Sequence, residues 1–213
     1  MCPENADREL LFRAAWGNDV AAMRDLLARN PSYAGTTECL PPRTPVGVWV
    51  DRQIGAGPTA ILHVAARQGH TEIAKLLLSH HAPVDPRDPL GGTPLHLAAQ
   101  YGHDEVAALL LDAGATLEAR RNGGLTPLAV AASHGRYPVV KRLLAAGADV
   151  NSRATFGWTP LHGAASEGRL NVVSLLLAYG ADPHARTDSD STPADLARTG
   201  HYDDVLRLLT SRL

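Results

Sequence analysis

The apolar residues of this chain recur at helical spacing, and they do so in pairs of short segments. In the second segment of each pair, apolar side chains fall three or four residues apart and form one stripe. These stripes are Ile73, Leu77 and Leu78; Val106, Leu110 and Leu111; Val139, Val140, Leu143 and Leu144; and Val172, Val173, Leu176 and Leu177. The first segment carries a small alanine pair, such as Ala98 and Ala99, and a glycine such as Gly102 follows it. The pattern predicts pairs of short helices joined by tight turns.

The paired segments repeat at one fixed interval, which we call the period. Equal steps separate Ala60, Thr93, Thr126, Thr159 and Thr192. An earlier copy within LLFRAAWGND has Glu9 at the equivalent place, and its step to Ala60 is longer than one period, which indicates an insertion. The last copy, STPADLARTGH, is interpreted as one residue short in its first helix. Such a period, about 33 residues, predicts units that gain stability by stacking on their neighbours.

The segment TPLHLAAQYGH, residues 93–103, and its counterpart TPLHGAASEGR, residues 159–169, resemble the ankyrin repeat. The resemblance implies an all-α solenoid, elongated and curved, with stacked helix–turn–helix units, hairpin loops and atypical terminal units. We therefore expect a single domain over residues 1–213 with about six repeats and one insertion at about residues 32–54. The expected repeats cover residues 5–31, 55–87, 88–120, 121–153, 154–186 and 187–213.

Histidine occupies one place in three of the copies, at His63, His96 and His162, whereas Ala129 stands there in another copy. By the resemblance, this imidazole bonds the loop backbone near the threonine hydroxyl. A catalytic group would not need to recur in every copy, so we interpret these histidines as structural.

Composition narrows the classes of partner. The 213 residues are 45% hydrophobic and 20% charged, with a formal net charge of −2, so no basic field favours nucleic acid or an anionic membrane. No stretch approaches the roughly 18 apolar residues of a membrane span. The two cysteines, Cys2 and Cys39, form neither a disulfide framework nor a paired zinc site. We expect a cytoplasmic protein without a metal or cofactor.

The resemblance implies a non-catalytic module that binds another protein through its concave face and hairpin tips. Positions on that face that packing does not dictate combine aromatic, aliphatic and arginine side chains, which is typical of interface hot spots. We predict partner contacts at Leu90, Tyr101, Arg121, Leu125, His134, Phe156 and Trp158. The competing interpretation is that Phe156 or Trp158 packs on a neighbouring hairpin.

The insertion is too long for a plain connection, and long loops of this kind are often functional. We predict further partner contacts at Trp49, Asp51 and Arg52. An equally weighted alternative is that the insertion only covers the core of the first repeat.

An enzyme is the alternative function. It would be an enzyme or a small-molecule-binding protein whose pocket lies between residues 32–54 and the concave face of the central repeats. Asp51, Arg52 and a histidine would line it. The chain contains no H-E-x-x-H, nucleotide-binding glycine loop or nucleophile elbow, so catalysis is the less favoured prediction.

Overall fold

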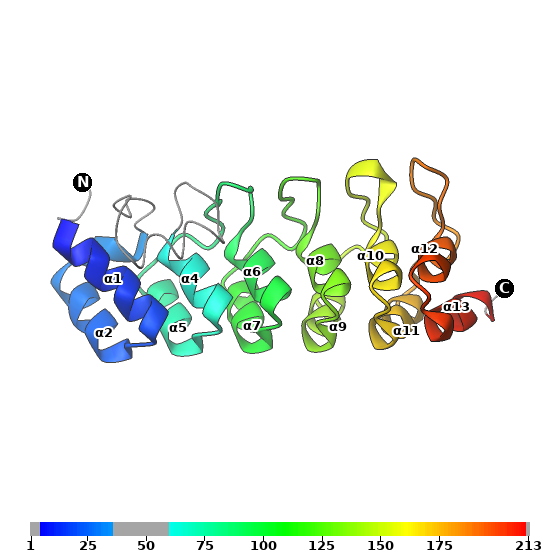
Figure 1. Cartoon of the computed structure of the whole chain (residues 1–213). Helices are drawn as coiled ribbons and strands as arrows, with labels where there is room; N and C mark the ends of the chain where they lie inside the picture. Colours follow the sequence, from blue (N-terminus) through cyan, green and yellow to red (C-terminus); the bar gives the residue numbers. More distant parts are fainter. Residues whose placement is uncertain (1–4, 36–59, 212–213) are drawn as a thin grey trace. The chain divides into compact units, whose positions relative to one another are not determined.

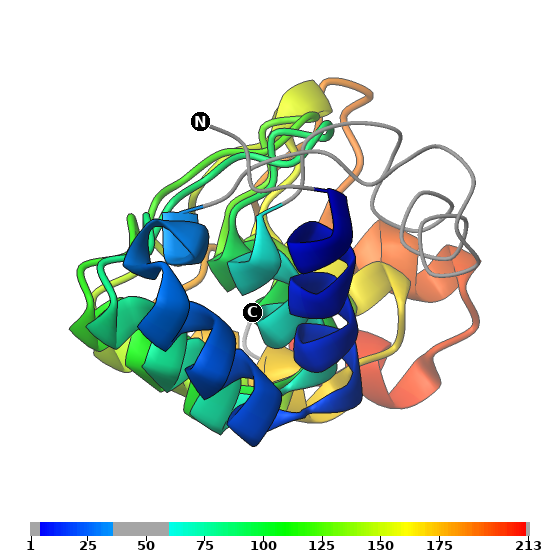
Figure 2. The same ribbon diagram turned by 90° about the vertical axis from the view of Figure 1, so that its left-hand side faces the viewer.

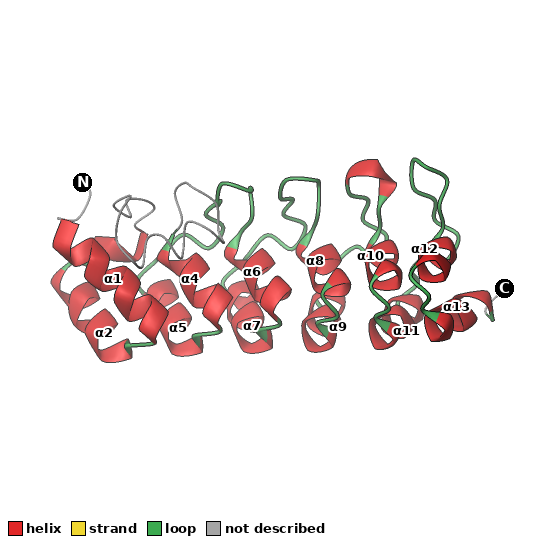
Figure 3. Cartoon of the chain, viewed as in Figure 1, coloured by secondary structure: helices red, strands yellow, loops and turns green. Residues whose placement is uncertain are grey.

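The computed structural model describes residues 5–35 and 60–211, and all regular elements there are helices (Figure 1). Figure 3 shows that loops connect these helices and that the described residues contain no strand. The all-α fold expected from the sequence is therefore confirmed. The α-helices are α1 (Asn5–Gly17), α2 (Val20–Arg29), α4 (Ile61–Gln68), α5 (Thr71–Ser79), α6 (Pro94–Tyr101), α7 (Asp104–Asp112), α8 (Pro127–Ser133), α9 (Tyr137–Ala145), α10 (Pro160–Ser166), α11 (Leu170–Ala178), α12 (Pro193–Thr199) and α13 (Asp203–Thr210). Two 3₁₀ turns accompany them, η1 (Pro31–Gly35) and η2 (Thr155–Gly157).

The chain forms two compact units. The first, called unit 1, comprises the described part of residues 1–98 together with residues 105–116. The second, called unit 2, comprises residues 99–104 and the described part of residues 117–213. Unit 1 contains α1 to α5 and most of α6 and α7, whereas unit 2 contains the end of α6 and α8 to α13.

In unit 1, each helix of the first pair packs on one helix of the second. Helix α1 contacts α4 and α2 contacts α5, and α1 and α2 lie side by side in Figure 2. A cation–π contact stabilises the packing of α1 on α4, because the guanidinium carbon of Arg67 lies 5.9 Å from the centre of the Trp16 ring. His70 adds a hydrogen bond of 2.8 Å between its Nδ1 and the carbonyl oxygen of Ala15.

In unit 2, α10 packs between α8 and α12, while α11 contacts α9 and α13. The alanine pairs explain how closely the first helices approach, because Ala131, Ala132, Ala164 and Ala165 are all fully buried. At Gly163 a Cβ atom would lie only 3.2 Å from the Cβ of Ser133, so the smallest residue lets α10 lie against α8.

In three copies the opening threonine caps the first helix. The hydroxyls of Thr126, Thr159 and Thr192 accept hydrogen bonds from backbone N–H groups at the start of α8, α10 and α12. Each of these helices has proline at its first position, where the missing N–H needs no partner.

The interpretation of the last copy as one residue short is wrong. Helix α12 has seven residues, like α8 and α10. The left-handed residue after it is His201, with φ of 58°, which lies one period after Gly168, whereas Gly200 keeps an ordinary φ of −80°. The glycine is displaced by one position, and a histidine takes the left-handed conformation.

Polar side chains also link successive copies at the same period. Asp85, Glu118 and Asn151 each accept a hydrogen bond from the backbone N–H 31 residues further on, at 2.8, 2.9 and 2.9 Å. His184 occupies the next equivalent place. These bonds agree with the expected register, while the repeat boundaries and the number of six repeats stay predictions.

Candidate functional site

Most of the predicted partner contacts lie in unit 2. The predicted contacts in unit 2 are Tyr101, Arg121, Leu125, His134, Phe156 and Trp158. Leu90 belongs to unit 1, where its side chain is 48% exposed. The predicted contacts Trp49, Asp51 and Arg52 lie outside the described residues.

Three hairpin tips of unit 2 form the centre of this candidate site, and we call residues 121–125, 154–158 and 187–191 the hairpin row. Backbone bonds join its members: Thr155 N–H donates to the Gly123 carbonyl at 2.8 Å, and Asp188 N–H donates to the Phe156 carbonyl at 2.9 Å. The row is therefore a linked surface and not three independent loops.

Arginine side chains reinforce the row, which the sequence interpretation did not foresee. Arg120 donates to the carbonyl of Arg153 at 2.7 Å, and Arg153 donates to the carbonyl of Arg186 at 2.8 Å. Arginine also bonds within its own hairpin: Arg87 of unit 1 donates to the carbonyl of Gly91 at 2.7 Å, as Arg120 does to that of Gly124 at 3.0 Å. The signal was available in the sequence, because these four arginines recur once in every period.

The aromatic residues of the site differ in how far they are exposed. Phe156 exposes 70% of its surface, more than any other large hydrophobic residue in the described part of the chain. Trp158 is half-buried, and its ring centre lies 6.0 Å from that of His162. Tyr101 is also half-buried and stacks on His103 at 6.4 Å. Trp158 and Tyr101 thus combine structural packing with a partly exposed edge.

Two polar residues border the aromatic ones. Arg121 is half-buried and donates a hydrogen bond of 3.2 Å to the side-chain oxygen of Gln100. His134 is exposed at the end of α8, where its Nδ1 lies 3.0 Å from the carbonyl oxygen of Val130. The cation of Arg121 and the apolar side chain of Leu125 begin and end the same hairpin tip.

The recurrent histidines hold the scaffold together. Thr159 donates its N–H to Nδ1 of His162 at 3.2 Å, so the ring proton sits on Nε2, which donates to the carbonyl of Ser191 at 3.2 Å. Thr93 and His96 repeat the first bond at 3.1 Å. Burial lowers the pKa of His63 and of His162 below the ordinary value of 6.5, although hydrogen bonds to backbone carbonyls oppose that shift. Both rings are neutral at pH 7, which agrees with their structural interpretation.

The copy with alanine in place of histidine uses a different bond. Ala129 leaves Thr126 without an imidazole partner, and the Thr126 hydroxyl lies 3.3 Å from the hydroxyl of the buried Ser152. The threonine still caps α8 through the N–H of Ala129 at 3.3 Å. A serine hydroxyl thus takes the place of the imidazole.

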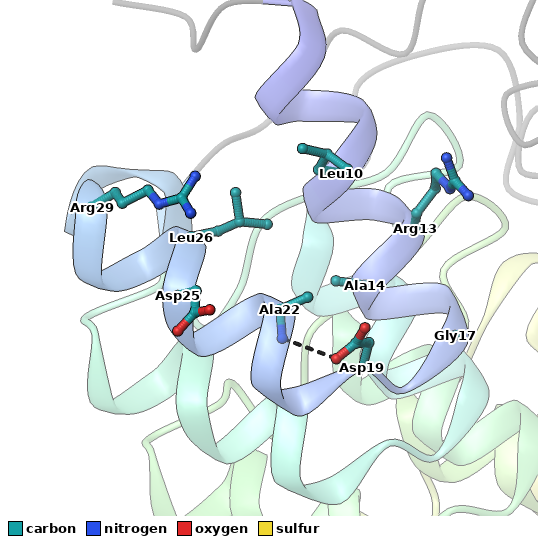
Figure 4. A pocket seen from close by; sticks show the side chains of 9 residues that line it. All are labelled: Leu10, Arg13, Ala14, Gly17, Asp19, Ala22, Asp25, Leu26 and Arg29. Atoms are coloured by element: carbon teal, nitrogen blue, oxygen red, sulfur yellow. Dashed lines mark hydrogen bonds between the residues drawn. The ribbon is translucent and has the colours of Figure 1, made fainter.

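A cavity of about 500 Å³ opens on the outer side of α1 and α2 (Figure 4). Leu10, Ala14 and Leu26 form its apolar floor, and Arg13 and Asp25 stand at its edge. At the places equivalent to Arg13, later copies carry Val64, Leu97 and Val130, which are all buried. The cavity therefore lies on a helix face that the other copies use for packing, and charged residues make it compatible with water.

Among residues 5–35 and 60–211, no group of three or more histidine, cysteine, aspartate or glutamate side chains is arranged to hold a metal ion. In the same part of the chain, no helix is long and apolar enough to cross a lipid bilayer.

Stacked pairs of short helices, tied together by threonine–histidine bonds and hairpin loops, define a helical repeat protein. A family model described as Ankyrin repeats (3 copies) matches the chain over residues 11–121, 62–154 and 128–212. The chain belongs to the ankyrin repeat family. Ankyrin repeats generally serve as protein–protein interaction modules. A search of curated proteins found no match to this chain.

Proposed function

We propose that the chain is a non-catalytic module that binds another protein through unit 2, on the side where the hairpin row and the first helices α8, α10 and α12 lie. Phe156, Trp158 and Tyr101 supply aromatic contacts, and Leu125, Arg121 and His134 surround them. Family membership supports the class of function, and the exposed ring of Phe156 on the linked hairpin row is the observation that carries the location. Leu90 of unit 1 and the inserted residues Trp49, Asp51 and Arg52 stay predicted partner contacts.

Rigidity supports this proposal. Hairpins that are bonded to one another before the partner arrives lose little conformational freedom on binding, so more of the interaction energy appears as affinity. Aromatic side chains are also the most frequent hot spots of protein interfaces. A cytoplasmic location is part of the same proposal.

The alternative of a pocket between residues 32–54 and the central repeats stays a prediction, because residues 36–59 lie outside the described residues. Its contacts differ from those of unit 2, so deletion separates the two hypotheses. Removal of residues 32–54 should leave partner binding largely intact if unit 2 carries the main contacts.

The decisive experiment combines Tyr101→Ala with Trp158→Ala. Partners are captured from the source cell with the wild-type chain, identified and purified, and their affinity for each variant is measured. We expect the double variant to bind about tenfold more weakly or worse, with an unchanged helical circular dichroism spectrum.

A matched control replaces two exposed tyrosines near the second helices. Tyr137→Ala with Tyr179→Ala removes side chains that are 41% and 45% exposed at the start of α9 and after α11. Binding should survive this change. Equal loss in both double variants, or no loss in either, would contradict the proposed location.

A further inference from the structure

We propose that Phe156 is a preformed anchor that enters an apolar pocket on the partner protein. This inference rests on the proposed function of unit 2 and specifies the chemistry of its partner. It begins with the backbone of the residue, which has φ of 61° and ψ of 22°. A bulky side chain rarely adopts this left-handed conformation, since its Cβ approaches the following carbonyl oxygen.

The neighbouring hairpin shows what packing alone would select at this place. Gly123 lies one period earlier, has φ of 83°, and avoids the steric conflict because it has no Cβ atom. Phenylalanine at the equivalent place keeps the unfavourable backbone and exposes 70% of its surface. The ring gains little from burial within the chain, so its own packing does not offset the strain.

The hairpin fixes the backbone that carries the ring. Ala154 donates its N–H to the carbonyl of Trp158 at 2.7 Å, and Gly157 donates to the carbonyl of Ala154 at 3.1 Å. The carbonyl of Phe156 accepts from Asp188 in the next hairpin at 2.9 Å. Because backbone bonds fix the residue on both sides, the direction of its Cα–Cβ bond is set before binding.

The ring also stands alone. Its equivalents in the adjacent hairpins are Gly123 and Ser189, which add no large apolar side chain beside it. A single projecting ring buries its surface best in a concave pocket and poorly on a flat surface.

The first test measures the melting temperature, which shows whether the Phe156 ring stabilises the fold or its backbone strain destabilises it. Asparagine tolerates the left-handed conformation and carries no apolar ring, so Phe156→Asn should melt at the same temperature as the wild type or about 2–4 °C higher. A fall of more than about 4 °C would show that the ring stabilises the fold, and it would overturn the inference.

The second test measures affinity for the purified partner that the wild-type chain captures. Phe156→Asn should bind about 30-fold more weakly, as expected for a hot spot, while Gly147→Asn changes affinity by less than about twofold. Gly147 lies in the turn after α9, outside the hairpin row, and has φ of 90°, so this control places asparagine in a left-handed conformation where its Cβ meets no atom within 4 Å.

The outcomes distinguish this inference from the proposed function. If Tyr101→Ala with Trp158→Ala abolishes binding while Phe156→Asn binds within about twofold of wild type, the anchor is overturned and the interaction surface of unit 2 remains. If the wild-type chain binds no protein, both fail.

Discussion

The buried histidine of a copy connects its own helix to the hairpin that follows. His162 accepts from Thr159 at the start of α10 and donates to Ser191 29 residues later. His63 makes the second bond, to Gly92 at 3.1 Å, but Ala60 replaces the threonine that would face its Nδ1. That buried nitrogen has no hydrogen-bond partner among the described residues, which costs stability.

The substitution Ala60→Thr should therefore stabilise the chain. The new hydroxyl would occupy the place that the Thr93 hydroxyl has beside His96, 3.0 Å from Nδ1. One added buried hydrogen bond is worth about 1 kcal/mol, or a rise of about 2–4 °C in the melting temperature of a chain of this size. Calorimetry of Ala60→Val provides the control, because valine has the same shape without a hydroxyl. Equal melting temperatures for the two variants would refute the role of the hydroxyl.

The buried histidines also predict how stability depends on pH. Burial lowers the pKa of His63 and His162 in the folded chain, so the unfolded chain binds more protons below its pKa of 6.5. Stability is therefore highest above pH 6.5 and falls as the pH decreases from there toward the folded pKa values. Between pH 7.5 and 5.5, each histidine lowers the free energy of unfolding by up to about 1 kcal/mol.

Urea denaturation at pH 7.5 and 5.5 measures this loss. His162→Asn should reduce the difference between the free energies of unfolding at the two pH values. His184→Asn, a change at an exposed histidine, should leave it unchanged. A wild-type chain that is equally stable at both pH values would exclude the proposed linkage.

At the scale of the element, each helix pair depends on its cap and on the adjacent pair. The Thr192 hydroxyl accepts from the N–H of Asp195, and the Asp195 carboxylate accepts from the N–H of Thr192 at 3.0 Å. The Thr192 hydroxyl and backbone N–H, with Arg198 beside them, hold the pKa of Asp195 below its ordinary value. This reciprocal cap fixes the start of α12.

Thr192→Ala should destabilise the last helix pair locally, by about 1 kcal/mol. Because copies in a stack depend mainly on their nearest neighbours, we expect faster amide hydrogen exchange in α12 and α13 and little change in α8 and α9. Thr199→Ala is the matched control, since that hydroxyl bonds a carbonyl within α12 and caps no N–H group. Uniform acceleration across unit 2 would contradict the local effect.

The helical elements could be predicted from the sequence because threonine, proline, alanine and glycine recur where caps, close packing and left-handed turns require them. The shifted glycine at Gly200 misled the interpretation of α12, since only the backbone shows that His201 takes the left-handed conformation. The site was harder to predict. Sequence gives the periodic place of Phe156 and Trp158, but only the structure shows that Trp158 is half-buried beside His162 while Phe156 is exposed.

At the scale of the whole molecule, the outer side of the first helix pair is a face on which no preceding pair packs among the described residues. Arg13 and Asp25 stand at the edge of the cavity on the outer side of α1 and α2, and both are exposed (Figure 4). Later copies have the buried Val64 and Leu97 at the place of Arg13, and the half-buried Leu109 at the place of Asp25. Charge at these two places keeps a packing face soluble and discourages association of one chain with another.

Arg13→Val combined with Asp25→Leu should therefore cause association. The two changes give this face the side chains that later copies use for packing, and they enlarge an apolar surface that already includes the half-exposed Leu10. Light scattering after size-exclusion chromatography should show a mass that rises with protein concentration for this variant. Arg13→Gln with Asp25→Asn removes the same charges without adding apolar surface, so it should keep the wild-type mass. Association of both variants would assign the effect to lost charge alone, and a constant mass for the apolar variant would show that this face does not support packing.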